Sequence, residues 1–279
     1  MTIKIVTDST CDLPKEIVEK YDITVIPAYI NFTDGSFLDG VEISRKDFYD
    51  RLPRYDTPPT TSAPAIGTFA RAYKKLMDEG ATHIISIHIS STLSGIYNVA
   101  VLAAEAMEKM VVKTFDPGNL SLGTGLIVEA AAKMAEAGKT VEEILEKLKG
   151  LAERTYTFAA LDTLKFLQRS GRISRLKAGF GSLLQIKPVI SMNAGKVDMA
   201  AARTSNGAIQ HLLDTLKSLG PLDTIALVHT NASEKAELLR TQAKQLCEQV
   251  AQAYSMEVTP VIGSHIGPGA YGFVAIKAS

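Results

Sequence analysis

Short apolar runs alternate with longer amphipathic segments over the first 150 residues, and this alternation limits the possible folds more than any other feature of the chain. The short runs have the length of strands, and the longer segments have helical spacing. Strands that alternate with helices predict a parallel sheet with helices on both faces. The predicted strands are 4–6, 24–31, 83–89 and 111–115, and the predicted helices are 14–21, 44–52, 65–79, 94–109, 123–137 and 141–154.

The pattern changes near residue 155. Two apolar runs, 188–192 and 197–201, are separated by little more than Asn193, Ala194 and Gly195, which predicts a β-hairpin and therefore a partly antiparallel sheet. We expect an α/β protein of two domains, with a parallel sheet in residues 1–153 and a mixed sheet in residues 154–279. The other predicted elements of the second domain are strands 157–161, 224–228, 258–262 and 273–277 and helices 207–219 and 233–254.

Composition excludes several classes of protein. Thirty Lys and Arg balance thirty Asp and Glu, which argues against a nucleic-acid binder that works through a broad basic field. The first residues lack a signal-peptide layout, and no apolar run approaches the ~20 residues that span a bilayer. Cys11 and Cys247 show no zinc-site spacing. We therefore expect a cytoplasmic protein with no transmembrane segment, no metal and no cofactor.

Three segments rich in hydroxyl groups or glycine follow predicted strands or precede predicted helices. They are 60–64 (TTSAP), 90–97 (SSTLSGIY) and 264–269 (SHIGPG). In a parallel sheet, ligands bind beyond the carboxyl ends of the strands, where helix N-termini offer free amides to an anion. We expect Thr61 and Ser94 at two helix starts to converge with His265 on one small anion, and Gly267 to let the backbone approach it. None of these segments contains an arginine, so a single carboxylate is a more natural ligand than a phosphate.

Other interpretations of the same residues stay open at this point. Thr61, Ser62 and Ser94 are also ordinary helix-capping residues. Ser94 could be the nucleophile of an esterase or acyltransferase with a histidine as base, although the G-x-S-x-G motif of such enzymes is absent. The ligand could also be a different small anion, such as a phosphorylated metabolite.

Six segments, taken together and in this order, resemble the DegV family of bacterial fatty-acid-binding proteins. The resemblance extends from residue 4 to residue 277. The segments are 6–14 (VTDSTCDLP), 61–64 (TSAP), 90–97 (SSTLSGIY), 162–173 (DTLKFLQRSGRI), 181–190 (GSLLQIKPVI) and 265–270 (HIGPGA).

The resemblance implies a carrier protein that is not itself a catalyst. It implies one long-chain fatty acid, such as palmitate, with its tail in an apolar tunnel between the two domains. Its carboxylate would be bound by Thr61, Ser94 and His265, with Ser62 and Gly267 nearby. It also implies a separate ATP-dependent kinase that phosphorylates the bound acid for lipid metabolism. The basic face for that partner would consist of Arg169, Arg172, Arg175 and Arg203.

Overall fold

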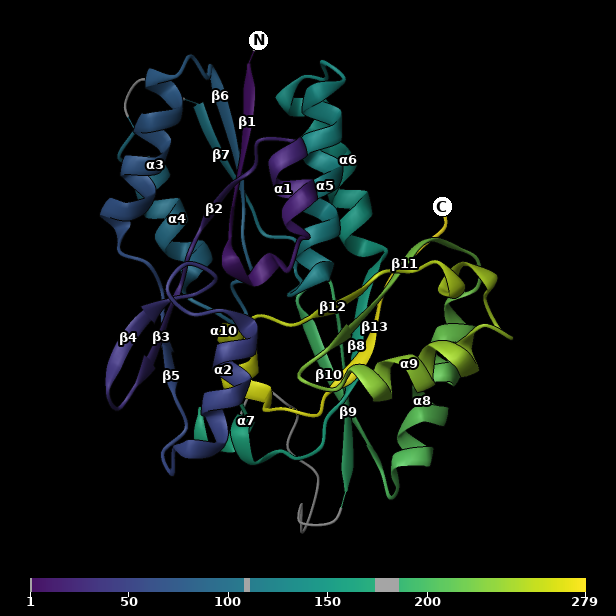
Figure 1. Cartoon of the computed structure of the whole chain (residues 1–279). Coiled ribbons are helices and arrows are strands. Elements are labelled where there is room, and N and C mark those ends of the chain that lie inside the picture. Colours follow the sequence, from purple (N-terminus) through teal and green to yellow (C-terminus); the bar gives the residue numbers. More distant parts are fainter. Residues whose placement is uncertain (1, 108–110, 174–185) are drawn as a thin grey trace.

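A computed structural model describes residues 2–107, 111–173 and 186–279 (Figure 1). Four parallel strands form the first sheet, in the order β2-β1-β6-β7. The expected parallel sheet is therefore confirmed. Its strands are β1 (Ile3–Asp8), β2 (Thr24–Ile26), β6 (His83–Ile87) and β7 (Val111–Phe115).

Helices cover both faces of this sheet (Figure 1). Ile84 packs toward α3 and α4, whereas Ile85 and Ile87 pack toward α5 and α6, because successive side chains of a strand point to opposite faces. This two-sided burial explains why the strand at 83–87 is apolar along most of its length. The helices of this half are α1 (Lys15–Lys20), α3 (Ile66–Asp78), α4 (Ile96–Glu105), α5 (Leu122–Glu136) and α6 (Val141–Glu153).

A small antiparallel sheet was not foreseen. The single strand predicted at 24–31 is wrong, because the chain leaves the parallel sheet at Pro27, which has no N–H to donate. It then forms the hairpin of β3 (Tyr29–Phe32) and β4 (Gly35–Leu38). β5 (Thr60–Ser62) pairs with the other edge of β3, so Thr61 lies in a strand and is not a helix cap, while the helix predicted at 65–79 follows as α3. A short helix, α2 (Arg45–Arg51), lies between β4 and β5.

The third sheet is mixed, as predicted. Its order is β10-β9-β8-β13-β11-β12, and only the β11–β12 pair is parallel. The hairpin turn lies at Ala194 and Gly195, both with positive φ, which suits a two-residue connection. The strands are β8 (Thr155–Ala160), β9 (Lys187–Asn193), β10 (Lys196–Ala202), β11 (Leu222–His229), β12 (Ser255–Glu257) and β13 (Tyr271–Lys277).

Helices from both halves of the chain cover the mixed sheet. α8 (Ser205–Leu219) and α9 (Ser233–Ala243) pack on one face, and α5 contributes Leu122 and Leu126 to the other. The helix predicted at 233–254 is too long, because Arg240 donates hydrogen bonds to the carbonyls of Val250 and Ala253 and the chain turns back there. All strands of the mixed sheet follow residue 154, while the domain boundary itself stays a prediction.

The strand predicted at 258–262 is also wrong, since these residues enter the helix α10 (Pro260–Ile266). Pro260 occupies its first turn, where the missing N–H costs no hydrogen bond. Although α10 follows β12 in sequence, it packs against α2, β3 and β5 of the first half. Another short helix, α7 (Lys165–Arg169), lies beside it. The helix α10 therefore lies between the small sheet and the mixed sheet (Figure 1).

Two buried carboxylates hold the start of α10. Asp12 accepts a hydrogen bond from the backbone N–H of Thr259 (2.8 Å), and Asp39 accepts one from the hydroxyl of Thr259. We call Asp12, Asp39 and Thr259 the α10 clamp. Arg45 (3.0 Å) and Ser121 (2.5 Å) also donate to Asp12. Every member of the clamp is at most 4% exposed.

The α10 clamp gives a prediction for the pH dependence of stability. Burial raises the pKa of Asp12 to about 6 and that of Asp39 to about 6, against a usual value of 3.8. The folded protein therefore takes up protons before the unfolded chain does as the pH falls. The free energy of unfolding should rise by on the order of 1–3 kcal/mol between pH 7.5 and pH 5, and this gain is lost as the pH rises through 6.

Urea unfolding at the two pH values measures this effect. Asp39→Asn keeps an oxygen that accepts from Thr259 but cannot titrate, so its gain between pH 7.5 and pH 5 should be smaller than that of the wild type. An equal gain in both proteins would contradict the assignment to Asp39.

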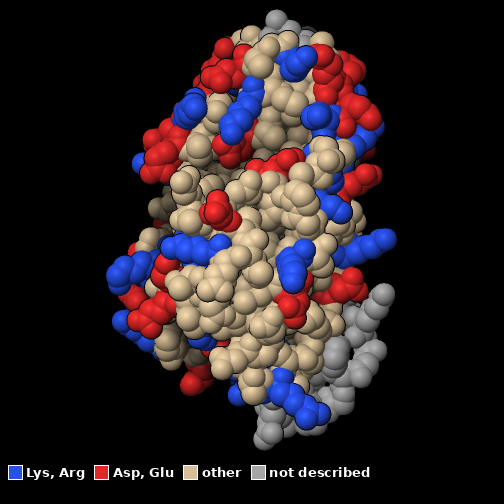
Figure 2. Space-filling view, turned by 90° about the vertical axis from the view of Figure 1, so that its right-hand side faces the viewer, with Lys and Arg blue, Asp and Glu red and all other residues tan. Residues whose placement is uncertain are grey.

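The surface carries both signs of charge. On the face shown in Figure 2, basic and acidic side chains are interspersed around a broad uncharged area. Within the described residues, no helix combines the length and the apolar character needed to cross a bilayer. Nor does the described part of the chain gather three or more His, Cys, Asp or Glu side chains that could hold a metal ion.

Candidate functional site

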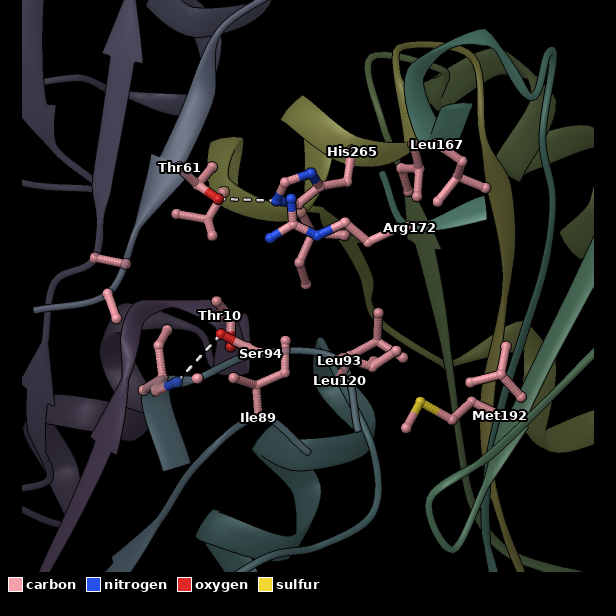
Figure 3. A pocket seen from close by; sticks show the side chains of 18 of the residues that line it. Thr10, Thr61, Ile89, Leu93, Ser94, Leu120, Leu167, Arg172, Met192 and His265 are labelled. Atoms are coloured by element: carbon pink, nitrogen blue, oxygen red, sulfur yellow. Dashed lines mark hydrogen bonds between the residues drawn. The ribbon is translucent and has the colours of Figure 1, made fainter. Parts of the chain in front are cut away.

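A cavity of about 210 Å³ lies between the small sheet, the end of the parallel sheet and the mixed sheet. Its walls come from β5, from the loop after β6, from β9 and β10, and from α10. Most of the lining is apolar, including Ile89, Leu93, Leu120, Ile190 and Met192. Figure 3 shows Thr61, His265 and Arg172 close together on one side of the cavity and Thr10 and Ser94 across from them. We call the part of the cavity between these two groups the polar end.

Thr61 and His265 meet at the polar end. The hydroxyl oxygen of Thr61 lies 2.9 Å from Nε2 of His265, although the two residues are 204 positions apart in the sequence. Thr61 is fixed by the pairing of β5 with β3, where it lies opposite Ile30. His265 lies in the last turn of α10. The structure thus brings together two of the three head-group residues that the sequence suggested.

Ser94 lies in the wall contributed by the loop after β6 (Figure 3). Its hydroxyl accepts a hydrogen bond from the N–H of Ile96 (3.3 Å), and α4 begins at that residue. Asp116 fixes the same loop by accepting hydrogen bonds from the N–H (2.9 Å) and the hydroxyl (2.6 Å) of Ser91. Ser94 is therefore at a helix start, as expected, and a rigid loop holds it.

The other two predicted ligand-binding residues, Ser62 and Gly267, have weaker connections to the cavity. Ser62 lines the cavity but is exposed, and its hydroxyl accepts a hydrogen bond from Asn31 (3.3 Å). Gly267 ends α10 with φ 74° and packs against the ring of Phe166. It is not among the described residues that line the cavity. Its ligand-binding role stays a prediction.

Arg172 is the polar residue that sequence reasoning placed elsewhere. It was expected on a basic face for a partner, yet it is half-buried and lines the cavity. Figure 3 shows its guanidinium group directed toward His265 and Thr61. It follows α7, outside the three hydroxyl-rich segments, and only the packing of α7 against α10 brings it to them. Arg169 and Arg203 are exposed, and Arg175 lies outside the described residues.

A second, apolar cavity of about 70 Å³ adjoins the first. Five residues line both cavities: Leu120, Ile190, Met192, Ile262 and Ile266. Beyond them the second cavity extends between the mixed sheet and the segment before α5, toward Val228 and Tyr271. The two cavities are therefore neighbours, with these five side chains between them.

Comparison with known proteins identifies the family. The model of the DegV family, described as a family of uncharacterised proteins, matches residues 2–278. A DegV domain-containing protein of Clostridium acetobutylicum is 36% identical over 280 residues, which cover 99% of each chain. The chain belongs to the DegV family.

Solved DegV structures share the whole fold. A DegV family protein from Thermus thermophilus, whose structure is described for its fatty acid binding, has 32% identity and a TM-score of 0.89. DegV from Bacillus subtilis, described as a fatty acid binding protein, has 30% identity and a TM-score of 0.88. The alignment covers 100% of both chains in each comparison.

The histidines of this DegV chain give little support to the esterase alternative. His88 is completely buried, and its two ring nitrogens lie 3.0 Å from Asp8 and 2.6 Å from the hydroxyl of Ser86. His229 lines the second cavity and not the wall that contains Ser94, and burial lowers its pKa. His265 shares the cavity with Ser94, but its Nε2 faces Thr61. The arrangement is better suited to hold an anion than to activate a serine.

Proposed function

We propose that this protein binds one long-chain fatty acid and acts as its carrier. The observation that carries the proposal is a mainly apolar cavity in which Thr61, His265 and Arg172 lie together and which a second, apolar cavity adjoins. The carboxylate lies at the polar end, with Thr61, Ser94, His265 and Arg172 around it, and the tail follows an apolar path past Met192. Relatives whose structures are described as fatty-acid-binding support the same ligand class.

The physical chemistry of the cavity fits this ligand. Each buried methylene contributes about 0.8 kcal/mol, so the apolar path supplies most of the affinity. A carboxylate removed from water without partners is strongly unfavourable, so the polar end fixes the orientation of the acid. One guanidinium group and two hydroxyl groups match one negative charge better than a phosphate dianion. The cavity therefore selects a ligand with one small anionic group and a long apolar tail.

Mass spectrometry of organic extracts from the denatured, purified protein tests the proposal. We expect a near-stoichiometric amount of long-chain fatty acid. If the extract holds no lipid and added acids also fail to bind, the carrier function is wrong. Hydrolysis of short acyl esters that is lost in Ser94→Ala would then favour the esterase alternative.

The head-group assignment gives a separate prediction. The double variant Thr61→Ala/Ser94→Ala should bind a long-chain acid about 100-fold or more weakly, because two hydrogen bonds to a charged group contribute about 3 kcal/mol or more together. Calorimetric titration of the folded variant measures the change. Ser62→Ala is the matched control and should bind as the wild type does, since its hydroxyl is exposed and bonded to Asn31. Undiminished binding by the double variant would locate the carboxylate elsewhere.

We infer further that the bound acid is presented to a separate ATP-dependent kinase, which phosphorylates its carboxylate in the cytoplasm. The family resemblance suggests this partner. The polar end has two exposed lining residues, Ser62 and Gly95, so the carboxylate lies close to the surface. Arg169 and Arg203 are exposed cations that suit an acidic or nucleotide-bearing partner.

The partner proposal predicts a loss of phosphorylation without a loss of binding. Arg169→Glu/Arg203→Glu should reduce acyl-phosphate formation by the fatty acid kinase of the source bacterium at least about tenfold, because reversed charges repel the docking surface. The affinity for the acid itself should stay unchanged in calorimetry. Full phosphorylation of the double variant would rule out these arginines as the docking face.

A further inference from the structure

The helix α10 closes a ring of contacts around the polar end. Thr61 in β5 contacts His265 at the end of α10. β5 pairs with β3, β3 pairs with β4, and Asp39 follows β4 directly. Asp39 then accepts a hydrogen bond from Thr259 at the start of α10. Besides packing against β3 and β5, α10 is therefore tied by side-chain hydrogen bonds at both ends, to β5 through His265 and to the residue after β4 through Thr259.

The two contact points are related by the geometry of the helix. His265 lies six positions after Thr259, which places it about 9 Å further along the axis at 1.5 Å per residue. A rigid helix held at its first turn has a fixed position at its last turn. α10 also packs against α2, α7, β3 and β5. We expect loss of the hydrogen bond at Thr259 to shift the helix within this packing and so to change the distance between His265 and Thr61.

Two further hydrogen bonds hold the start of α10 near Thr259. Asp12 lies at the end of the loop after β1 and accepts a hydrogen bond from the backbone N–H of the same Thr259. Tyr49 in α2 donates to the carbonyl of the preceding Val258 (3.1 Å). Neither Asp12 nor Asp39 is among the described residues that line the cavity. These carboxylates therefore do not contact a ligand in the cavity directly, and their shared partner Thr259 links both of them to α10.

We propose that Asp12 and Asp39 are positioning residues for the head group, which hold α10 so that His265 stays opposite Thr61. This inference rests on the proposed function, because the head group in question is the carboxylate of the fatty acid. It explains why two buried carboxylates, which are costly to remove from water, lie at a helix start rather than in the ligand site. It also assigns a role to the Asp12 of the first motif that the sequence singled out.

Thr259→Val tests the proposal at the contact itself. The substitution removes the hydroxyl group that donates a hydrogen bond to Asp39, and the valine side chain keeps a shape similar to that of threonine. We expect binding of palmitate to weaken about tenfold, as loss of one well-placed hydrogen bond would cause. Binding of the alcohol with the same tail should change less than twofold, because it depends on the apolar path. Thr259→Ser should restore the wild-type affinity.

The matched control is Thr204→Val, because Thr204 starts α8 and its hydroxyl accepts the N–H of Gly207 (3.0 Å), far from the cavity lining. It should leave both affinities unchanged. A variant of the partner residue, Asp39→Ala, should reproduce the selective loss. The double variant Thr259→Val/Asp39→Ala should lose no more than Asp39→Ala alone, since Asp39→Ala already removes the hydrogen bond to Thr259. Equal losses for acid and alcohol would show a merely structural role and overturn the proposal.

A measurement without any lipid separates this proposal from the proposed function. The ring signals of His265 in an NMR spectrum, assigned with His265→Gln, should shift in Thr259→Val and stay in place in Thr204→Val. If palmitate does not bind the wild type at all, the carrier function fails, yet the NMR result still tests the positioning of His265. Unchanged His265 signals in Thr259→Val would overturn the inference even if palmitate binds.

Discussion

Replacing Met192 by tryptophan is expected to weaken the binding of a long-chain fatty acid by about 100-fold. Met192 lies in β9, is 2% exposed, and lines both the first and the second cavity. It therefore lies on the path proposed for the tail, between the two cavities. An indole ring at this position would block this path and confine the tail to the part nearer the polar end.

The magnitude follows from the methylenes that are displaced. If roughly four methylenes can no longer be buried, the loss is about 3 kcal/mol at 0.8 kcal/mol each, which corresponds to about 100-fold in affinity. Short-chain acids that do not reach Met192 should lose much less. The ratio of long-chain to short-chain affinity is therefore the decisive quantity, and calorimetry on both ligands measures it.

A control separates exclusion of the tail from general damage to the core. Met134→Trp makes the same substitution in α5, among residues that pack on the far face of the parallel sheet. It should leave both affinities unchanged. Because the chain has no tryptophan, each variant carries a single indole, whose emission maximum shows whether it is buried. A folded Met192→Trp variant with a buried indole and unreduced long-chain affinity would show that the tail takes another path.

The parallel sheet could be predicted because its physical causes act within each segment. Residues 83–87 are almost entirely apolar because helices cover both faces, and that burial is visible in the sequence itself. The hairpin at Ala194 and Gly195 could be predicted for the same kind of reason, since positive φ at a two-residue turn favours particular residues.

Tertiary packing decided the elements that the sequence left ambiguous. Residues 258–262 form an apolar run that fits either a strand or a buried helix, and only the docking of α10 between two sheets makes it a helix. Thr60–Ser62 is too short and too polar to be recognised as a strand, and it becomes one because the edge of β3 is available. Local patterns do not show which partner a segment will meet.

In the candidate site, too, some residues could be predicted from local sequence and one depends on tertiary packing. Thr61, Ser94 and His265 could be suggested because each lies in a segment rich in hydroxyl groups or glycine. The sequence did not indicate that Arg172 belongs with them, because a basic run such as 169–175 is usually a solvated face. The positive charge at the polar end therefore became evident only once α7 was placed against α10.

Gly267→Ala is expected to destabilise the folded protein by roughly 3–5 kcal/mol, far more than most single substitutions. Gly267 has φ 74° and ψ 175°, a backbone conformation that is essentially restricted to glycine and costs other residues about 1–3 kcal/mol. A Cβ atom there would also lie 2.3 Å from the ring of Phe166. Either the end of α10 or the Phe166 ring of α7 must therefore move, and the cost of this movement adds to the backbone penalty.

Gly138→Ala separates these two contributions. Gly138 has nearly the same φ, 76°, but a Cβ atom added there would have no neighbour within 4 Å, so only a backbone penalty of about 1–2 kcal/mol applies. Urea unfolding of both variants gives the excess cost at Gly267, and a variant of Phe166 isolates the part due to packing. In the double variant Gly267→Ala/Phe166→Ala the added methyl group has room, so its cost should be smaller than in the wild-type background. If the two glycine variants were equally stable, contact with Phe166 would not explain the glycine, and its proposed approach to the ligand would become the better explanation.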